Sequence, residues 1–502
     1  MENKVKFLGL IFDQRLTWLE HFKYIKSKCS RRLNLMRSLT GTSWGASKTA
    51  LLTIYRALIR PLLDYGAPAL DSASIKTKSI FNTIQYNALK LCCCAMAGTA
   101  LSSLQVDCGE PPLKFRRLQA QIKFGIKIKA TENHPSLCIS EDHWSNYYGK
   151  FNKENESFYN KTKQFFDEHK LSLDLIKPNP VPPWAQKKVN IDTKLSNKLN
   201  KSDPVKLQES FGRELIENYK DYIKVYTDGS KNVDGKVAAA YYVHNFNVSN
   251  SVRISDNLTV FTAELIAIKL AVKWITDNSD NDSVKNKPIV ILSDSLSALV
   301  ALETKTSKTR PNLINTLLSD LYNLNNEVVL AWIPSHVNLK GNDIADSLAK
   351  GALANSSVDV EIPFEHNELN DVINKYITDL WQTDWSNCKT GSFYRKIEPN
   401  VSNKIKYINN NRNTEIKITR LRLGQCRLHK YLNKIDRHPT GLCQTCQEEE
   451  SIDHYLLHCL ESNLNYKIKL LCKKFSVGYN VIDILRHPII LSDVVSSINR
   501  NL

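Results

Sequence analysis

The sequence has no long apolar run. None of its segments approaches the roughly 18 consecutive apolar residues that a membrane-spanning helix needs. The first apolar stretch, within MENKVKFLGLIFDQ, is short and ends at Asp13. A secretory signal peptide carries a longer apolar core, so the sequence predicts neither a signal peptide nor a membrane partner. We therefore expect an intracellular protein, with nucleus and cytoplasm not distinguished and protein partners unknown.

The sequence also lacks internal repeats and any excess of acidic residues. Its 68 Lys and Arg against 51 Asp and Glu give a formal net charge of +17, which indicates a polyanionic partner. Residues 1–134 hold 21 basic and 8 acidic residues, a net charge of +13. Residues 221–355 hold 13 basic and 14 acidic residues, a net charge of −1. The positive charge therefore gathers in the N-terminal part of the chain.

Changes in composition divide the chain into segments, and its 502 residues allow roughly two to four domains. We expect a mainly helical region over 1–134, a linker rich in Asn, Lys, Ser and Glu over 135–215, a regular α/β domain over 216–356, a helical segment over 357–435, and a Cys/His-rich module with a helical tail over 436–502.

The N-terminal segment carries helical patterns. Apolar residues recur with helical periodicity over 51–62, in a helix that Pro61 is expected to kink or end, and Gly66 is expected to lie in a turn. The 12 cysteines of a chain without a signal peptide predict thiols or metal ligands rather than disulfides. Cys92 to Cys94 lie in a helical run without ligand spacing, which predicts thiols of a buried core.

Two aspartates end strands that the sequence predicts to be buried. Residues 223–230, IKVYTDGS, predict a strand that delivers Asp228 at its end, and residues 288–295, PIVILSDS, predict a parallel-type strand that ends at Asp294. Further strands are predicted over 236–244, 247–254 and 328–336, the last ending at His336.

Two more acids lie on predicted helices. Glu264 is in the first turn of a helix over 262–275, and a helix over 341–353 carries both Asp343 and Asp346. Acids at strand ends in an α/β sheet fall where such sheets bind ligands. Converging carboxylates repel each other unless divalent cations lie between them, and hard oxygen ligands suit Mg²⁺ or Mn²⁺. A pair of such ions suits phosphodiester hydrolysis.

These residues also carry a family resemblance. TDGS, TAEL, LSDS and SHVNLKGNDIADSLA resemble, in order and spacing, the motifs of type 1 ribonuclease H domains, found alone and inside retroelement polyproteins. The resemblance implies a ribonuclease H-like α/β fold, a five-stranded mixed sheet with flanking helices. It implies an endoribonuclease that hydrolyses the RNA strand of RNA–DNA hybrids with two Mg²⁺ or Mn²⁺ ions. The implied metal ligands are Asp228, Glu264, Asp294 and Asp346, with His336 as a mobile catalytic helper. In the family's GN-x-x-AD pattern the ligand is the Asp after Ala, which excludes Asp343.

Each of these residues has a commoner structural role when taken alone. Glu264 suits a helix N-terminus, Asp294 can cap the next helix, and His336 can be a surface residue at a strand end. Their combination favours the nuclease over a related integrase or exonuclease fold. A catalytically inert nucleic-acid-binding retroelement remnant is the alternative that the sequence leaves open.

Residues 5–130 resemble the region after the palm, the thumb/connection region, in reverse transcriptases of jockey-like non-LTR retrotransposons. The segments KFLGLIFDQRLTW, TIYRALIRPLLDYG and CGEPPLKFRRLQ carry this resemblance. The polymerase box of that family requires adjacent aspartates, and the chain contains no Asp-Asp pair, so we expect no polymerase activity. Basic residues of this region are expected to contact nucleic-acid phosphates: Lys23, Lys26, Lys28, Arg31 and Arg32. A solvated basic helix face is the alternative interpretation.

A C-x2-C-x7-H-x4-C pattern lies near the C-terminus. Its members, Cys443, Cys446, His454 and Cys459, can close a tetrahedron around Zn²⁺. His458 is the competing ligand. The pattern resembles the C-terminal knuckle of the same retroelement class. An ordinary helical tail without metal is the alternative.

Overall fold

The computed structural model of the chain describes residues 3–41, 44–137, 158–177, 189–194, 217–335, 339–409, 411–498 and 502. The chain divides into two compact units. Unit 1 comprises Met1–Phe124, Gly149–Lys161 and Ile373–Leu502, and unit 2 comprises Gly125–Tyr148 and Thr162–Val372. This division differs from the five expected segments, because both flanks of the α/β domain contribute to unit 1. None of the helices in the described ranges has the length and apolar character needed to cross a membrane.

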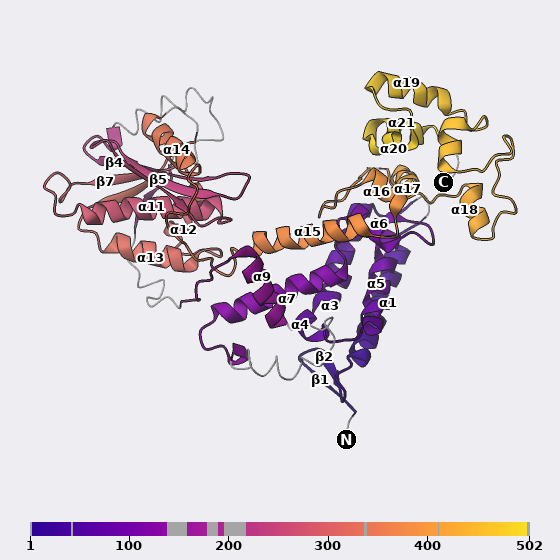
Figure 1. Ribbon diagram of the computed structural model, residues 1–502, viewed down its shortest axis with the longest axis horizontal. Coiled ribbons are helices and arrows are strands. Elements are labelled where there is room, and N and C mark those ends of the chain that lie inside the picture. Colours follow the sequence, from indigo (N-terminus) through magenta and orange to yellow (C-terminus); the bar gives the residue numbers. More distant parts are fainter. Residues whose placement is uncertain are drawn as a thin grey trace. The chain divides into compact units, whose positions relative to one another are not determined.

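Unit 2 is built around a mixed sheet with helices on both faces (Figure 1). Its described elements are η2 (Pro135–Leu137), α9 (Phe158–His169, which begins in unit 1), β3 (Asn190–Asp192), β4 (Ile223–Lys231), β5 (Val237–Val243), β6 (Val248–Ile254), α11 (Val260–Asp277), β7 (Ile289–Ser293), α12 (Leu296–Glu303), α13 (Pro311–Tyr322), β8 (Val328–Trp332) and α14 (Lys340–Ala352).

The strand order in the sheet is β3-β8-β7-β4-β5-β6. β4 pairs antiparallel with β5, which pairs antiparallel with β6, whereas β4, β7, β8 and β3 are joined by parallel pairing across the other half. All five residues of β7 are buried, as its continuous apolar run predicts for a central parallel strand. The first three residues of the edge strand β6 are exposed. The expected α/β class and mixed sheet are thus confirmed, with β3 as a sixth strand.

Helices α11 and α14 cover opposite faces of the sheet. In Figure 1, α14 lies above the strands, and α11, α12 and α13 lie below them. Gly341 of α14 approaches the ring of Tyr226 so closely that a Cβ atom at 341 would lie 2.2 Å from it. Successive side chains of a strand point to opposite faces of the sheet. Asp228 is two residues after Tyr226 in β4, so the two side chains point to the same face.

The segment expected to be a linker, 135–215, contains a helix and a strand within its described part, besides the short turn η2. Helix α9 buries Phe165 and Phe166, and β3 adds a strand beside β8. The Asn-Ile-Asp sequence of β3 is too short to show an alternating pattern, and the Phe pair stands in an otherwise polar segment. Most of the remainder of this segment lies outside the described residues.

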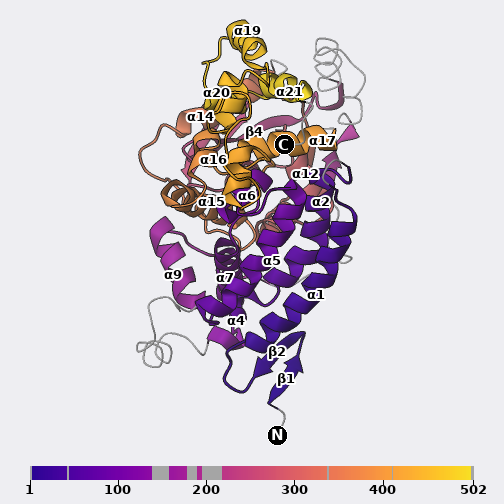
Figure 2. The same cartoon turned by 90° about the vertical axis from the view of Figure 1, so that its right-hand side faces the viewer.

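The N-terminal part of unit 1 is mainly helical, as expected. Its elements are β1 (Lys4–Phe7), β2 (Leu10–Asp13), α1 (Leu19–Ser38), α2 (Lys48–Ile54), a π-helical turn (Tyr55–Ile59), α3 (Arg60–Asp64), α4 (Ala67–Leu70), α5 (Ile75–Cys93), α6 (Leu101–Cys108) and α7 (Leu113–Ala130, which ends in unit 2). Figures 1 and 2 both show α1 and α5 side by side, and the rings of Phe22 and Phe81 stack between them at 4.0 Å. Cys92 and Cys93 are buried, as expected for core thiols.

Pro61 does not end its helix. The chain passes from α2 through the π-helical turn into α3, where Pro61 occupies the first turn. A proline costs little there, because the first N–H groups of a helix have no helical partner. Gly66, with φ of 72°, makes the expected turn after α3.

The C-terminal part of unit 1 packs against these N-terminal helices. Its elements are α15 (Asn370–Asn387, which begins in unit 2), α16 (Ser392–Ile397), α17 (Arg412–Arg422), α18 (His429–Lys434), a π-helical turn (His454–His458), α19 (Asn465–Phe475), α20 (Val481–Arg486) and α21 (Pro488–Ser496). The buried Lys48 connects the two parts: its backbone N–H donates to Glu415, and its ammonium lies 2.5 Å from Asp107. Asp107 also accepts from the Tyr394 hydroxyl at 2.9 Å.

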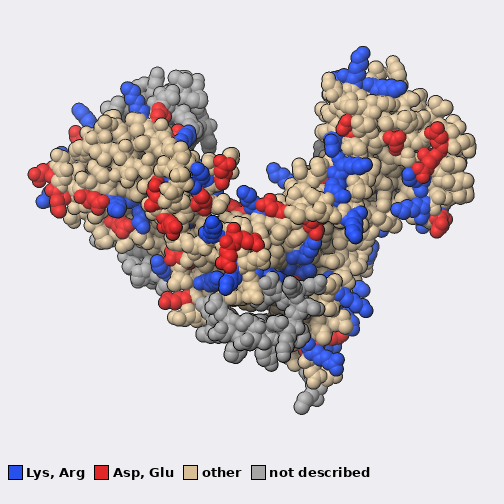
Figure 3. Space-filling view, in the orientation of Figure 1, with Lys and Arg blue, Asp and Glu red and all other residues tan. Residues whose placement is uncertain are grey.

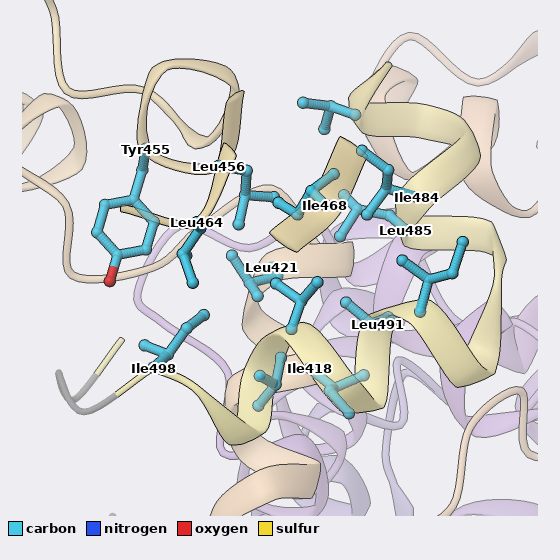
Figure 4. Packing of buried hydrophobic residues seen from close by; sticks show 14 of the residues in the cluster. Ile418, Leu421, Tyr455, Leu456, Leu464, Ile468, Ile484, Leu485, Leu491 and Ile498 are labelled. Atoms are coloured by element: carbon cyan, nitrogen blue, oxygen red, sulfur yellow. The ribbon is translucent and has the colours of Figure 1, made fainter. Parts of the chain in front are cut away.

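Residues after 410 share a second apolar core. Figure 4 shows side chains of α17, α19, α20 and α21 pointing toward one another, together with Leu456 and Leu464 from the Cys/His-rich module. Leu421, Leu456 and Ile468 are fully buried. The module is therefore held partly by an apolar core of the surrounding helices and is not an isolated knuckle.

Candidate active site and metal centres

Asp228 and Asp294 lie side by side because of the strand register. β4 and β7 are parallel neighbours in which Thr227 is opposite Ser293, and each aspartate is the next residue in its strand direction. The Thr227 hydroxyl donates to the Leu292 carbonyl at 3.3 Å, and the Trp332 indole N–H donates to the Asp294 carbonyl at 3.1 Å. These bonds fix the backbone where the parallel pairing of β4 with β7 ends. β4 itself continues to Lys231, so Asp228 lies inside its strand and not at the expected strand end.

Glu264 is brought to the same point by a close helix–strand contact. Thr259 caps α11, since its hydroxyl accepts from the backbone N–H of Thr262. The first turn of α11 then passes over Gly229, where a Cβ atom would lie 2.5 Å from the backbone nitrogen of Glu264. Only glycine allows this approach, which places the Glu264 carboxylate beside Asp228.

The three carboxylates form one cluster. Asp228, Glu264 and Asp294 each offer an oxygen, and these oxygens all lie within 4.8 Å of one another. Asp228 is 7% exposed and Glu264 6% exposed, while Asp294 is half-buried. Burial, with the charges of Asp294 and Asp346, raises the pKa of Asp228 to about 7. Burial, with the charges of Asp228 and Asp294, raises the pKa of Glu264 well above its usual range.

Asp346 approaches this cluster from α14. It lies close enough to Asp228 to raise that residue's pKa, but it is not among the three groups whose oxygens lie within 4.8 Å. Its carboxylate is 2.7 Å from the ammonium of Lys350, one helical turn later. Asp343 is exposed on the same helix. The structure therefore separates Asp346 from Asp343 as the family pattern does.

The cluster fits divalent cations. The charge of Asp294 helps to raise the pKa of both Asp228 and Glu264, which is an unfavourable arrangement without a compensating positive charge. Glu264 Oε2 is buried and has no hydrogen-bond donor among the described residues. A hard divalent cation would satisfy that oxygen and offset the repulsion, and carboxylate oxygens are the ligands that Mg²⁺ and Mn²⁺ take.

His336 lies outside the described residues, so its position relative to the cluster is not given. The nearest described residues on either side of it are Ser335, after β8, and Leu339, before α14.

The five basic residues expected to contact phosphates all lie on α1, in different surroundings. Lys23, Lys26 and Arg31 are exposed, and Lys23 forms an ion pair with Glu20 at 2.9 Å. Lys28 is half-buried over the ring of Tyr24, and Arg32 donates to the Leu58 carbonyl. Lys26 and Arg31 are thus the two without a described protein partner.

The four predicted zinc ligands come together in unit 1. Cys443, Cys446, His454 and Cys459 each offer a ligand atom, and these atoms all lie within 4.8 Å of one another. A tight hairpin, closed by pairing of Leu442 with Glu449, holds the first two cysteines. The π-helical turn carries the histidine and leads into the last cysteine.

The histidine is oriented as a ligand. His454 Nδ1 lies 3.0 Å from a carboxylate oxygen of Glu448, while the buried Nε2 has no partner among the described residues. Metal-binding histidines commonly use one ring nitrogen for the metal and the other for such a carboxylate. The competing residue, His458, is 57% exposed and lies 3.4 Å from Asp453, which removes it from the cluster.

The sheet, the acid cluster and their helices coincide with a known family. Residues 220–354 match the family model described as RNase H. This part of the chain is an RNase H domain. The match runs from the residues before β4 to the end of α14 and includes all four carboxylates. The domain is accordingly a nucleic-acid-binding hydrolase fold whose family acts on the RNA of RNA–DNA hybrids. In Figure 3, acidic and basic side chains both lie over this RNase H domain, in agreement with its near-zero net charge.

Two features of the RNase H domain are not evident from the sequence pattern. Gly229 lies within β4, and its missing side chain is what admits α11. Asn342, in the GN-x-x-AD pattern, is 5% exposed, and its Oδ1 has no donor among the described residues. The Gly-Asn pair ahead of Asp346 is the signal that could have found it, but its packing role requires the neighbouring strand to be known.

Proposed function

We propose that the chain is an endoribonuclease that hydrolyses the RNA strand of RNA–DNA hybrids by a two-metal-ion mechanism. The observation that carries the proposal is the convergence of Asp228, Glu264 and Asp294 within 4.8 Å, with Asp346 beside them. The match of residues 220–354 to RNase H supports the same reaction class.

The four carboxylates would hold two Mg²⁺ or Mn²⁺ ions. When bound, these ions supply Lewis-acid chemistry, the activation of a water and the stabilisation of the leaving oxygen. Asp228 would contribute a ligand from within β4 and Asp294 from the position directly after β7, and Glu264 would contribute a buried oxygen from α11. Asp346 would contribute a ligand that is 30% exposed, and its ion pair with Lys350 must open to free both oxygens. His336 is proposed, from the family resemblance alone, as a residue that assists catalysis.

Selectivity for hybrids follows from the two different strands of the substrate. A hybrid presents 2′-hydroxyl groups on one strand and deoxyribose on the other, and a protein that reads both rejects the two homoduplexes. We therefore expect cleavage of the RNA in a hybrid but not of duplex DNA or single-stranded RNA.

An end-labelled hybrid incubated with the full chain and Mg²⁺ tests the activity. Asp294→Asn keeps the side chain's shape and removes its charge. It should lower the cleavage rate by more than the roughly 10–100-fold that loss of an outer-shell partner costs at a metal site. Asp343→Asn is the matched control, because Asp343 is an exposed acid on the helix that carries Asp346. A fully active Asp294→Asn protein refutes the metal-site assignment. A folded wild-type chain that binds hybrid but never cuts it supports the inert remnant instead.

We also propose that the Cys/His cluster of unit 1 binds one Zn²⁺. Three thiolates and an imidazole are the donor set of structural zinc sites, and the unpartnered His454 Nε2 completes it. Elemental analysis of the purified chain should give one zinc per molecule, lost in Cys446→Ser. His458→Ala should keep the full zinc content, because His458 is exposed and outside the cluster. Zinc well below one per chain in the wild type refutes the site.

We further propose that the chain derives from a truncated non-LTR retroelement. The resemblance of residues 5–130 to the post-palm region and the Cys/His cluster support this origin. A primer-extension assay should show no polymerase activity, because the sequence contains no adjacent aspartates. Extension of a primer by the purified chain would contradict this interpretation.

A further inference from the structure

Unit 1 contains a polar cavity distinct from both metal-type clusters. Its volume is about 280 Å³, and its charged and amide-bearing walls include Arg56, Arg60, Glu110, Arg116, Asn374 and Asn403. The arginines come from the N-terminal helices and the asparagines from the C-terminal part, so this cavity exists only because the two parts pack together.

Glu110 organises two of the arginines. Its carboxylate is 1% exposed, and it lies 2.5 Å from Arg56 Nε and 3.3 Å from Arg60 Nη1. Gly109, with φ of +63°, sets the direction of this segment, and a Cβ atom there would lie 2.7 Å from the Lys404 carbonyl oxygen. The glutamate is therefore fixed in place, and it orders the two guanidinium groups at the cavity.

The cavity has one positive charge in excess. Arg116 is paired with Asp64 through two hydrogen bonds, and Glu110 is shared by Arg56 and Arg60. Three guanidinium groups thus share two carboxylates, of which only Glu110 lines the cavity, and no further charged residue lines the described cavity. A phosphodiester group carries one negative charge, which balances this excess.

The cavity also offers hydrogen-bond donors that the described protein does not use. Arg60 donates only through Nη1, so its Nε and Nη2 have no described acceptor, and its side chain is 28% exposed. The Oδ1 of Asn374 accepts from Gln119 at 2.7 Å, which leaves the amide nitrogen of Asn374 as a donor. Burial and the charge of Arg116 lower the pKa of Lys123, in keeping with an electropositive surrounding.

We propose that this cavity binds a single phosphate group, held by Arg60 and Asn374 with Arg56 and Arg116 behind them. Guanidinium groups suit phosphate oxygens because their planar N–H donors can form paired bonds. The source we favour is the backbone of a nucleic acid, since residues 1–134 carry a net charge of +13 and the chain contains an RNase H domain. The inference rests on the proposed function only for the choice of a hybrid as probe.

Asn374→Asp is the decisive variant. It is isosteric, its oxygen can still accept from Gln119, and it places a negative charge in the cavity without breaking the Glu110 ion pairs. Binding of a labelled RNA–DNA hybrid to the full chain is measured in chelator-free buffer without divalent cations. Cleavage cannot occur under these conditions, so the measured affinity does not depend on whether the chain is an active nuclease. Removal of one phosphate interaction should weaken binding about tenfold at 0.1 M salt and reduce the log–log salt slope by about 0.9.

Asn387→Asp is the matched control. Asn387 is exposed at the far end of α15, about 20 Å from Asn374 along the helix, beyond the roughly 10 Å over which salt screens a charge. It should leave affinity and slope unchanged. Arg60→Gln, checked for an unchanged melting temperature, should reproduce the Asn374→Asp effect.

The competitor identifies the source of the phosphate. If a DNA duplex displaces the labelled hybrid and inorganic phosphate does not, the ligand is a nucleic-acid backbone. If millimolar phosphate displaces the hybrid from the wild type but not from Asn374→Asp, the cavity is a site for free phosphate. Both support the cavity as a phosphate site. The phosphate-site proposal is overturned if Asn374→Asp binds the hybrid with the wild-type affinity and salt slope. It is also overturned if Asn374→Asp changes the binding of a polyglutamate peptide but not the binding of the hybrid.

Discussion

A single methyl group added at Gly229 tests how the carboxylate cluster is held together. The first turn of α11 crosses the strand end so closely that the Cβ atom of Gly229→Ala would lie 2.5 Å from the Glu264 nitrogen and 2.6 Å from the Ala263 carbonyl carbon. These neighbours are backbone atoms, which cannot turn aside as a flexible side chain can. The variant therefore has to move the helix or the strand.

The size of the effect follows from these distances. Ordinary van der Waals contact begins near 3.4 Å, so α11 must shift by about 1 Å relative to β4. Overpacking of this kind costs about 1–3 kcal/mol of folding stability. Misplacement of a reacting group by about 1 Å can cost about a hundredfold in rate. Glu264 moves with its helix. We therefore expect the cleavage rate to fall by more than the smaller folded fraction of the variant would explain.

The assay combines initial rates on a labelled hybrid at saturating Mg²⁺ with a thermal unfolding curve. Gly351→Ala is the control, because no atom lies within 4 Å of a Cβ at that helical position. It should leave the rate unchanged and stabilise the protein by up to about 1 kcal/mol, since alanine is the better helix former. A Gly229→Ala protein with the wild-type rate and melting temperature would refute the close helix–strand contact as the device that positions Glu264.

Other consequences concern unit 1 and its surface. Lys48→Met leaves Asp107 buried without its cation and should lower the free energy of unfolding by about 3–5 kcal/mol in urea titrations. Burial opposes ionisation of Asp107, but the charge of Lys48 outweighs it and lowers the pKa of that carboxyl. The stability it contributes is therefore present above the unfolded pKa of about 3.9 and is lost as pH falls toward the lower folded value, so the difference between wild type and Lys48→Met should shrink below about pH 4. Loss of zinc in Cys446→Ser should remove amide-exchange protection from the hairpin around it while leaving α21 protected, because α21 has its own apolar contacts. Replacing Lys26 and Arg31 by Gln should flatten the salt dependence of hybrid binding by about 0.9 for each phosphate interaction that the substitutions remove.

Each of these predictions has an outcome that would contradict it. An unfolding free energy of Lys48→Met within about 0.5 kcal/mol of wild type would mean that the ion pair of Lys48 with Asp107 does not stabilise unit 1. Uniform loss of protection in Cys446→Ser, including α21, would make the metal the support of the whole C-terminal core. An unchanged salt slope would leave Lys26 and Arg31 as a solvated basic face.

The carboxylate site was largely accessible from the sequence because its parts are local. Strands that end at Asp228 and Asp294, and a helix that begins near Glu264, are visible as short apolar runs followed by acids. The structure brings these residues together with two differences from the expectation. β4 continues past Asp228 to Lys231, and α11 begins at Val260, so Glu264 follows its first turn. The Cys/His cluster was accessible for the same reason, because its four ligands lie within 17 residues of sequence, from Cys443 to Cys459.

The sequence alone thus indicates which residues make up the two clusters and the type of most elements around them, since periodicity and ligand spacing depend on neighbours along the chain. Tertiary structure alone decided the rest. Whether His454 or His458 joins the cysteines depends on which way a π-helical turn faces. The joining of residues before 125 with residues after 372 depends on contacts such as that of Lys48 with Glu415, which are 367 positions apart. Packing of this kind rests on shape and burial between distant segments, and a single sequence carries no local signal of it.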